Sequence, residues 1–427
     1  MRPLPLTVPL LVHAALGQSA GNAAIDTDDA ALARWAMSLR AAAIATPAGA
    51  NAADAARGAL ACLRAGDLAG ARNAVAAARL AATVAAAPPL ADVCWSLLAL
   101  GWYVDAAGDD AFAATAWPTL RAALRQLAHA PAAPRFADEC LAIQACFAVA
   151  SLCHRAGGEA LPWTNRALVR SERLERTAWQ RMRGRFRSAA DDGLLAKRAH
   201  PPAEPGDLAA AWLGLGAPTG PLPRHGRSAL AELTARAAAT PAADSMHAAA
   251  VRLAAATELG DASARCAALA ALRRFPADGA GPADAALALD ALLFALTGLR
   301  QATACGRAGE LVDAVELAPW LPHGARSLRL HGVVAAGATF DLEVSARVGP
   351  PGADERDAAA CLAGARPRLV VVVAMRATAD GAPRAILLRG LGDAAIAALA
   401  GGERWLASLP TPQLDAQHQL RGRGDRR

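Results

Sequence analysis

The chain has 427 residues, of which 54% are hydrophobic and 4% aromatic, and its formal net charge is +6. A chain of this length is long enough for about two or three domains, or for one large domain built from repeats. The positive excess is small and no nucleic-acid-binding motif accompanies it, so we do not expect nucleic acid as a partner.

Residues 1–24 combine features of a signal peptide and of a linker. Arg2 precedes an apolar run that ends at Gln18-Ser19-Ala20, as in a short signal peptide. Prolines and His13 interrupt this run, which favours a linker or the remnant of an upstream strand. Eight scattered cysteines without a CxxC pair favour a reducing compartment. We therefore expect a cytoplasmic protein, and export through this weak signal is the alternative.

An aspartate lies at the start of an apolar, helix-like segment six times along the chain. Successive aspartates are separated by 37 to 69 residues, which is the scale of a repeat made of two helices. The segment from Gly281 to Arg300 is apolar on nearly every face, and such a helix must be buried on all sides. The six aspartates are Asp54, Asp92, Asp138, Asp207, Asp244 and Asp284.

Amphipathic helices alternate with these apolar segments. Their arginines recur every three or four positions, which gives each helix one solvated face and one buried face. Six inner apolar helices within six outer amphipathic helices predict an (α/α)6 toroid of six helical hairpins over residues 25–305. The alternative is an open solenoid, whose inner helices would carry more polar residues on the concave face. No segment after residue 24 has 18 uninterrupted apolar residues with membrane flanks, so we expect no transmembrane span.

The pattern changes after residue 305. Residues 316–349 alternate at period two around glycine turns, and residues 367–390 contain a β-rich run and a hairpin-like turn. Together they predict a small β-rich C-terminal domain over residues 306–410. We expect a closing helix over residues 393–409 within this domain. The last residues, 411–427, are rich in glutamine and arginine, and we expect them to form a disordered basic tail.

Three stretches resemble one family of carbohydrate-active proteins. They are Ile25 to Gly49, Trp95 to Leu124, and Asp290 to Arg300 followed by Glu316 to Val344. In order and spacing they are similar to the toroid and the β segment of bacterial amylo-α-1,6-glucosidases, which are glycogen-debranching-type proteins of the six-hairpin glycosidase superfamily. The resemblance spans residues 25–345. It implies a role in carbohydrate metabolism and, if the protein is active, inverting glycoside hydrolysis by an acid/base carboxylate pair.

The chain departs from this family where the catalytic loops are expected. Only an acid, Asp54, remains of the Gly-Arg-Asp that precedes the first inner helix of the family. Ala142 stands where the family often has the glutamate of Glu-Val-Gln, and the loops at 129–136 and 240–247 are short. These losses predict reduced catalytic loops and a possible pseudoenzyme.

The candidate site follows from the geometry of a toroid. The N-terminal ends of its inner helices meet at one mouth, where we expect the acids to gather. Inverting hydrolysis needs two carboxyl groups about 6.5–9.5 Å apart, one of them protonated. We take Glu139 as the candidate acid, with Asp244 or Asp207 as its partner. The predicted substrate-binding residues are Asp92, Trp95, Asp138, Trp212, His247 and Asp290.

Each of these residues also has a structural interpretation. An aspartate at a helix N-terminus caps the helix, which is worth about 0.5–2 kcal/mol. Trp95 and Trp212 equally suit a hydrophobic core, and His247 suits a local hydrogen bond to Asp244. Asp290 is different because it lies inside an apolar helix, where a carboxylate needs a buried partner or a polar central channel.

Three functions remain open at this point. The first is a six-hairpin glycosidase-like protein with reduced loops. The second is a non-catalytic toroid that binds an oligosaccharide or a protein, and the third is a purely structural helical domain. Opposed acids in an open mouth would favour the first, aromatic residues without opposed acids the second, and a plugged mouth the third. Neither a phosphate loop nor metal-ligand spacing is present, so we expect no cofactor and no metal. The sequence does not indicate an oligomeric state.

Overall fold

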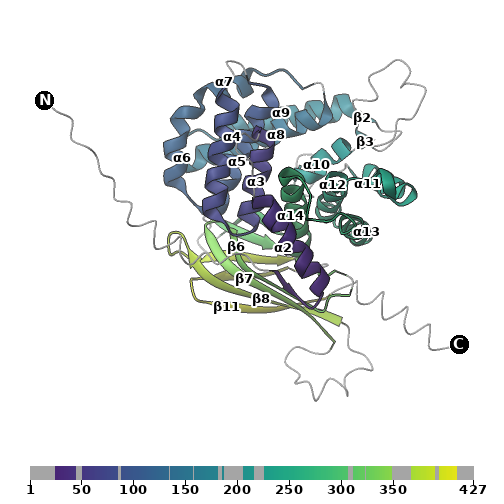
Figure 1. The fold of residues 1–427 in the computed structure, drawn as a ribbon. Coiled ribbons are helices and arrows are strands. Elements are labelled where there is room, and N and C mark those ends of the chain that lie inside the picture. Colours follow the sequence, from purple (N-terminus) through teal and green to yellow (C-terminus); the bar gives the residue numbers. More distant parts are fainter. Residues whose placement is uncertain are drawn as a thin grey trace.

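The structure is a computed structural model of the chain, in which helices lie above a layer of strands (Figure 1). It describes residues 25–44, 51–84, 88–133, 135–156, 158–180, 185–186, 205–215, 226–305, 311–322, 324–348, 367–389 and 394–410. The predicted N-terminal segment and the predicted basic tail lie outside the described residues.

Apolar helices form a closed ring in the described part of the chain. Each helix packs against the next one along the chain, and the last, α14, packs against the first, α3. The predicted toroid is therefore confirmed, and the open solenoid is wrong. The ring consists of α3 (Ala52–Arg64), α5 (Leu90–Ala107), α8 (Phe136–Arg155), α10 (Ala209–Trp212), α12 (Met246–Glu258) and α14 (Pro282–Thr297).

Burial explains why the inner helices lack a polar face. Every residue of α14 from Ala285 to Thr297 is buried, including Asp290. Helices α5 and α8 are long and apolar enough to cross a membrane, but 67% and 72% of their most apolar windows are buried inside the protein. Their hydrophobicity therefore serves the ring, as the repeat pattern predicts.

The outer helices cover the ring with their apolar faces. The outer segment from Asp110 to His129 is not one helix, because the 3-10 turn that contains Pro118 separates two shorter helices. The outer helix from Leu161 ends at Ala178, and a short hairpin follows in which Trp179 pairs with Phe186. The outer elements are α2 (Ala30–Ile44), α4 (Leu68–Val84), α6 (Asp110–Ala116), η1 (Trp117–Leu120), α7 (Arg121–His129), α9 (Leu161–Ala178), β2 (Trp179–Gln180), β3 (Arg185–Phe186), α11 (Arg227–Ala239) and α13 (Ala262–Leu272).

The fourth inner position is shorter than the others. It consists of a 3-10 turn, η3 (Pro205–Leu208), followed by α10, which has 4 residues. The other inner helices have 13 to 20 residues. Gly214, with φ +77°, lies just beyond the end of α10. A left-handed glycine at this place ends a helix without strain, so one wall of the ring stops early.

Strands form two sheets beneath the ring. In the described residues, one sheet has the order β1-β6-β7-β8-β11 and the other the order β10-β9-β5-β4. Buried residues of both sheets, such as Val371 and Leu388, belong to the same hydrophobic core as α14. The strands are β1 (Ile25–Thr27), β4 (Arg300–Cys305), β5 (Leu311–Leu317), β6 (Ser327–Ala335), β7 (Ala338–Val348), β8 (Pro367–Thr378), β9 (Arg384–Arg389), β10 (Ala394–Leu399) and β11 (Arg404–Pro410).

The predicted closing helix over residues 393–409 is wrong. Residues 394–399 form β10 and residues 404–410 form β11, with a turn at Gly401 and Gly402 between them. Gly402 has φ +86°, which a helix interior does not allow. The alanines of this segment favour a helix locally, but β8 and β9 supply strand partners, and this tertiary pairing outweighs the weak local preference.

The ring and the sheets meet at close backbone contacts. Gly298 follows α14 with φ +58°, and the Ala318 amide donates a hydrogen bond of 2.9 Å to the Thr297 carbonyl. At the tip of the β6–β7 hairpin, the Gly337 amide donates to the Ala106 carbonyl of α5 at 2.9 Å. These contacts attach the strands to the ends at which the inner helices finish.

Gly298→Ala is expected to lower the free energy of unfolding by about 2–3 kcal/mol. A Cβ at this position would lie 2.6 Å from the Ala318 carbonyl oxygen, and the positive φ adds backbone strain. Gly281→Ala is the matched control, because its φ is −59° and its Cβ would meet nothing within 4 Å. Urea denaturation of both variants measures the difference, and equal midpoints would contradict the tight junction.

Candidate functional site

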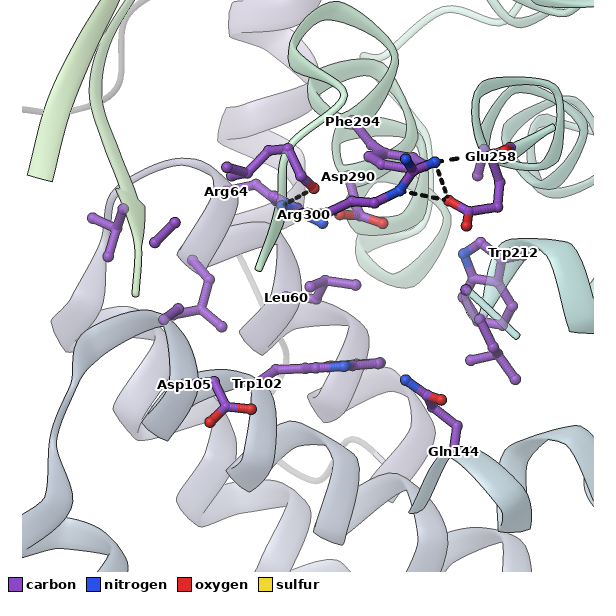
Figure 2. A pocket seen from close by; sticks show the side chains of 18 residues that line it. Leu60, Arg64, Trp102, Asp105, Gln144, Trp212, Glu258, Asp290, Phe294 and Arg300 are labelled. Atoms are coloured by element: carbon purple, nitrogen blue, oxygen red, sulfur yellow. Dashed lines mark hydrogen bonds and ion pairs between the residues drawn. The ribbon is translucent and has the colours of Figure 1, made fainter. Parts of the chain in front are cut away.

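A cavity of about 410 Å³ lies where the inner helices end and the sheets begin (Figure 2). We call it the central cavity. Val334 and Ala335 of β6 contribute to its lining from the strand side. The early stop of α10 brings Trp212 and Gly214 to its wall. Its charged and larger polar or aromatic lining residues are Arg64, Trp102, Asp105, Gln144, Trp212, Glu258, Asp290, Phe294 and Arg300.

Asp290 is a buried carboxylate in this wall. Its Oδ1 accepts a hydrogen bond of 2.9 Å from Arg64 Nε, and Arg64 Nη1 donates to the Leu299 carbonyl at 3.4 Å. Burial raises the pKa of Asp290, and the Arg64 charge opposes this rise. Asp290 therefore has the buried partner that its position inside α14 requires.

Glu258 and Arg300 form a second ion pair in the same wall. Arg300 donates to Glu258 Oε2 from Nε at 3.1 Å and from Nη2 at 2.8 Å. Arg300 Nη1 also donates to Glu316 Oε1 at 3.3 Å, and Arg389 Nε lies 2.9 Å from the same oxygen. A chain of charges thus joins α12 of the ring to β4, β5 and β9.

The facing wall carries an indole and an amide. Figure 2 shows Trp102 and Gln144 across the cavity from the Arg64–Asp290 and Arg300–Glu258 pairs. Asp105 lines the same wall and accepts hydrogen bonds from Arg155 Nε at 2.9 Å and Ser151 Oγ at 2.6 Å. The cavity is therefore charged on one wall and partly aromatic on the other.

Behind this lining, Trp95 fills part of the ring. Its ring centroid lies 5.8 Å from that of Trp212 and 6.4 Å from that of Trp102. Trp95 is buried, and the Arg57 guanidinium lies 5.4 Å from its centroid on another side. Trp95 therefore supports the two tryptophans of the cavity as a packing residue rather than facing a ligand.

Two of the three predicted catalytic acids, Glu139 and Asp244, form ion pairs with arginines. Glu139 is buried, and its Oε2 accepts hydrogen bonds from Arg170 Nη2 at 2.9 Å and from the Ala133 amide at 2.7 Å. This pair joins α8 to the outer helix α9 and to the loop before α8. Asp244 pairs with Arg252 in the same way, with Arg252 Nη1 donating to Oδ1 at 3.0 Å.

The other predicted residues near the starts of the inner helices have different surroundings. Asp207 is buried in η3, and Asp92 is half-buried in the first turn of α5. Asp138 Oδ2 lies 4.0 Å from Arg135 Nε. His247 Nδ1 lies 3.6 Å from Asp284 rather than near Asp244, and burial together with the Arg57 charge lowers the pKa of His247.

Two of the predicted acids, Asp138 and Asp244, line two separate hollows. Asp138 lines an apolar hollow of about 580 Å³ with Pro89 and Gln126, and Asp244 lines another of about 240 Å³ with Arg236. Glu139 and Asp244 each turn toward a nearby guanidinium group, that of Arg170 and that of Arg252. Capping also differs from expectation, because Ser245 rather than Asp244 accepts the hydrogen bond at the start of α12.

The structure brings only two predicted residues, Trp212 and Asp290, to the central cavity. The prediction missed Arg64, Trp102 and Glu258 because it considered the starts of the inner helices and not their ends. One sequence feature could have found two of them: Arg64 and Glu258 are charged residues at the C-terminal ends of alanine-rich inner helices.

The described residues contain no group of three or more histidine, cysteine, aspartate or glutamate side chains placed to hold a metal ion. The central cavity instead combines paired charges, indole rings and an amide. Such a surface can hydrogen-bond a small polar ligand and pack against an apolar face of it.

Comparison with known proteins identifies the fold alone. No protein-family model matches the chain, and no curated protein matches it. Among solved structures, a GH78 family rhamnosidase of Bacillus sp. GL1 matches with a TM-score of 0.53 and 13% identity, over 76% of this chain and 40% of that protein. A Streptomyces avermitilis α-L-rhamnosidase complexed with L-rhamnose matches with a TM-score of 0.56 and 12% identity, over 90% of this chain and 42% of that one.

A putative kojibiose phosphorylase from the human microbiome has a TM-score of 0.42 and 9% identity, over 74% of this chain and 49% of that protein. The chain thus spans 40–49% of the length of these proteins. The likeness to the two rhamnosidases shows the fold of the chain, a helical toroid with a β domain.

Proposed function

We propose that this protein binds a saccharide in the central cavity, between the ring and the β domain. The observation that carries the proposal is the lining: Trp102 and Trp212 stand with Gln144 and two arginine–carboxylate pairs around a space of about 410 Å³. Small-ligand pockets have volumes of about 300–1,000 Å³. The glycosidase-like fold supports the same ligand class, although the two rhamnosidases extend well beyond this chain.

The two walls suit the two kinds of surface on a sugar ring. The C–H groups of a pyranose can pack against the face of Trp102, while its hydroxyl groups meet donors and acceptors. Gln144 supplies both kinds of polar group, since its amide has two donor hydrogens and an acceptor oxygen. Burial strengthens such hydrogen bonds because water does not compete for them.

The arrangement of the carboxylates favours binding without hydrolysis. Inverting hydrolysis needs carboxyl groups on opposite sides of the scissile bond. Asp290 and Glu258 lie on the same wall in Figure 2, and each accepts hydrogen bonds from an arginine. We therefore propose a catalytically degenerate glycosidase-like protein.

Hydrolysis is the second candidate function, and one observation favours it. Burial raises the pKa of Asp290, and a general acid must hold its proton at the working pH. In this case the relation to glycogen-debranching enzymes suggested by the sequence would make α-1,6-linked glucosides the substrates.

A binding assay paired with a turnover assay separates these functions. Calorimetry is run with L-rhamnose, D-glucose, D-galactose and isomaltose, and sugar release is followed from isomaltose, panose and an α-L-rhamnoside. Saturable binding without release supports the proposal. Release of glucose or rhamnose that Asp290→Asn abolishes would establish the second candidate instead. Absence of binding and of release in the whole panel would contradict a carbohydrate function.

Trp102→Leu is expected to weaken the binding of the best sugar in this panel about tenfold, or about 1.4 kcal/mol. The substitution removes the flat aromatic surface of Trp102 but keeps an apolar side chain at this position. Trp163→Leu is the matched control, because Trp163 lies on the outer helix α9 under Arg166. Calorimetric titration of both variants measures the effect, and equal dissociation constants would show that Trp102 does not face the ligand.

A further inference from the structure

The two carboxylate oxygens of Glu258 have different surroundings. Oε2 accepts both hydrogen bonds from Arg300. Oε1 is buried and has no hydrogen-bond partner within the described residues. The side chain is 3% exposed and lines the central cavity. Buried polar atoms in proteins nearly always have a partner, so an unpartnered acceptor beside a cavity indicates where a ligand donor fits.

The cations of the cavity, in contrast, are already engaged. Arg64 donates to Asp290 and to the Leu299 carbonyl, and Arg300 donates to Glu258 and Glu316. The charged residues that line the cavity are two arginines and the three carboxylates of Asp105, Glu258 and Asp290. Both guanidinium groups of the wall are therefore already paired with a carboxylate, whereas Glu258 Oε1 is a negatively charged acceptor without a partner in the described part of the chain.

We infer that the central cavity selects an uncharged saccharide, which donates a hydroxyl hydrogen bond to Glu258 Oε1, and that it rejects sugar acids. This inference rests on the proposed function. A sugar carboxylate would meet the Glu258 oxygen with charge of the same sign. An ammonium group is also disfavoured, because the Arg300 guanidinium lies 2.8 Å from the other oxygen of the same carboxylate.

The partners of Arg300 determine which oxygen of Glu258 is free to accept a hydrogen bond. Glu316 accepts a hydrogen bond from Arg300 on the strand side, and Arg389 pairs with Glu316. Arg300 therefore stays bonded to Glu258 Oε2, and Glu258 Oε1 has no partner among the residues that the structure describes. The last torsion of a glutamate side chain is broad, and a small rotation about it brings Oε1 to the cavity surface. Arg300 is thus a positioning residue for the Glu258 carboxylate.

The test compares matched neutral and acidic sugars. The dissociation constants of D-glucose and D-glucuronate, and of D-galactose and D-galacturonate, are measured at pH 7 and low salt. The wild-type protein is expected to bind the neutral member of the pair at least about tenfold more tightly, because like charges in a desolvated site repel. In Glu258→Gln this ratio should fall below about threefold, while Glu172→Gln, an exposed control on α9, should keep it.

The outcomes separate this inference from the proposed function. If no sugar binds, the proposed function fails and the inference fails with it. If neutral sugars bind and sugar acids bind equally well, or if a folded Glu258→Gln keeps the wild-type ratio, only the inference is overturned. Should the variant not fold, the wild-type protein still decides: added salt should strengthen uronate binding and leave glucose binding unchanged, since it screens the repulsion.

Discussion

Glu139→Ala is expected to lower the free energy of unfolding by about 3–5 kcal/mol and to leave saccharide binding by the folded protein unchanged. Removing this carboxylate leaves the Arg170 guanidinium buried without its ionic partner, since the Arg170 side chain is only 10% exposed. The Ala133 amide loses its acceptor as well. Both losses fall on the contact between α8 and α9, away from the central cavity.

The neighbouring residue provides the control for this prediction. Asp138→Ala should change the unfolding free energy by less than about 0.5 kcal/mol, because the Asp138 side chain is 37% exposed and lies 4.0 Å from Arg135. Urea denaturation followed by circular dichroism compares the two variants. A stable Glu139→Ala protein that loses a glycosidase activity of the wild type would instead restore the catalytic role predicted from the sequence.

The ring could be predicted from the sequence because burial on all sides leaves a clear pattern. In α14, thirteen consecutive residues from Ala285 to Thr297 are buried, so polar residues are nearly absent from every face. The fourth inner helix lies just after Asp207, as predicted, but it has only 4 residues. Its early end depends on Gly214 adopting a positive φ, which the apolar pattern before it does not reveal.

The strands after residue 393 show the limit of local patterns. Alanine-rich residues 394–399 have helical composition, and their strand conformation comes from pairing with β9. That partner can be identified only after the sheet has formed. The correction therefore reflects tertiary pairing, which outweighs helix propensity when the differences per residue are a few tenths of a kcal/mol.

The site was harder to predict than the fold, because its residues are defined by partners on other helices. Glu139 is attractive in the sequence as an acid at a helix start, but its partner Arg170 is 31 positions further along. Asp290 was the exception, since a carboxylate inside a buried helix requires a partner wherever that partner lies. That partner, Arg64, lies 226 positions away in the sequence.

Arg64→Met is expected to lower the free energy of unfolding at pH 7 by about 3–5 kcal/mol. The substitution keeps an apolar side chain but leaves the Asp290 carboxylate buried without a cation. Asp290 is 5% exposed, so water cannot replace the lost charge. The double variant Arg64→Met/Asp290→Leu should recover most of the loss, because replacing both members of a buried ion pair by apolar residues is close to neutral.

The pH dependence of this stability loss tests whether the Asp290 carboxylate causes it. Burial already raises the folded-state pKa of Asp290 above its ordinary value of 3.8, and loss of Arg64 raises it further. The folded state of Arg64→Met therefore keeps the proton on Asp290 to a higher pH than the unfolded state does. The stability that comes from this proton is present below about pH 4 and is lost as the pH rises through the folded-state pKa. The deficit of Arg64→Met relative to wild type should therefore grow from about 1 kcal/mol near pH 4 to the full value at pH 7. Equal deficits at both pH values in urea titrations would show that Asp290 is not the charge that Arg64 compensates.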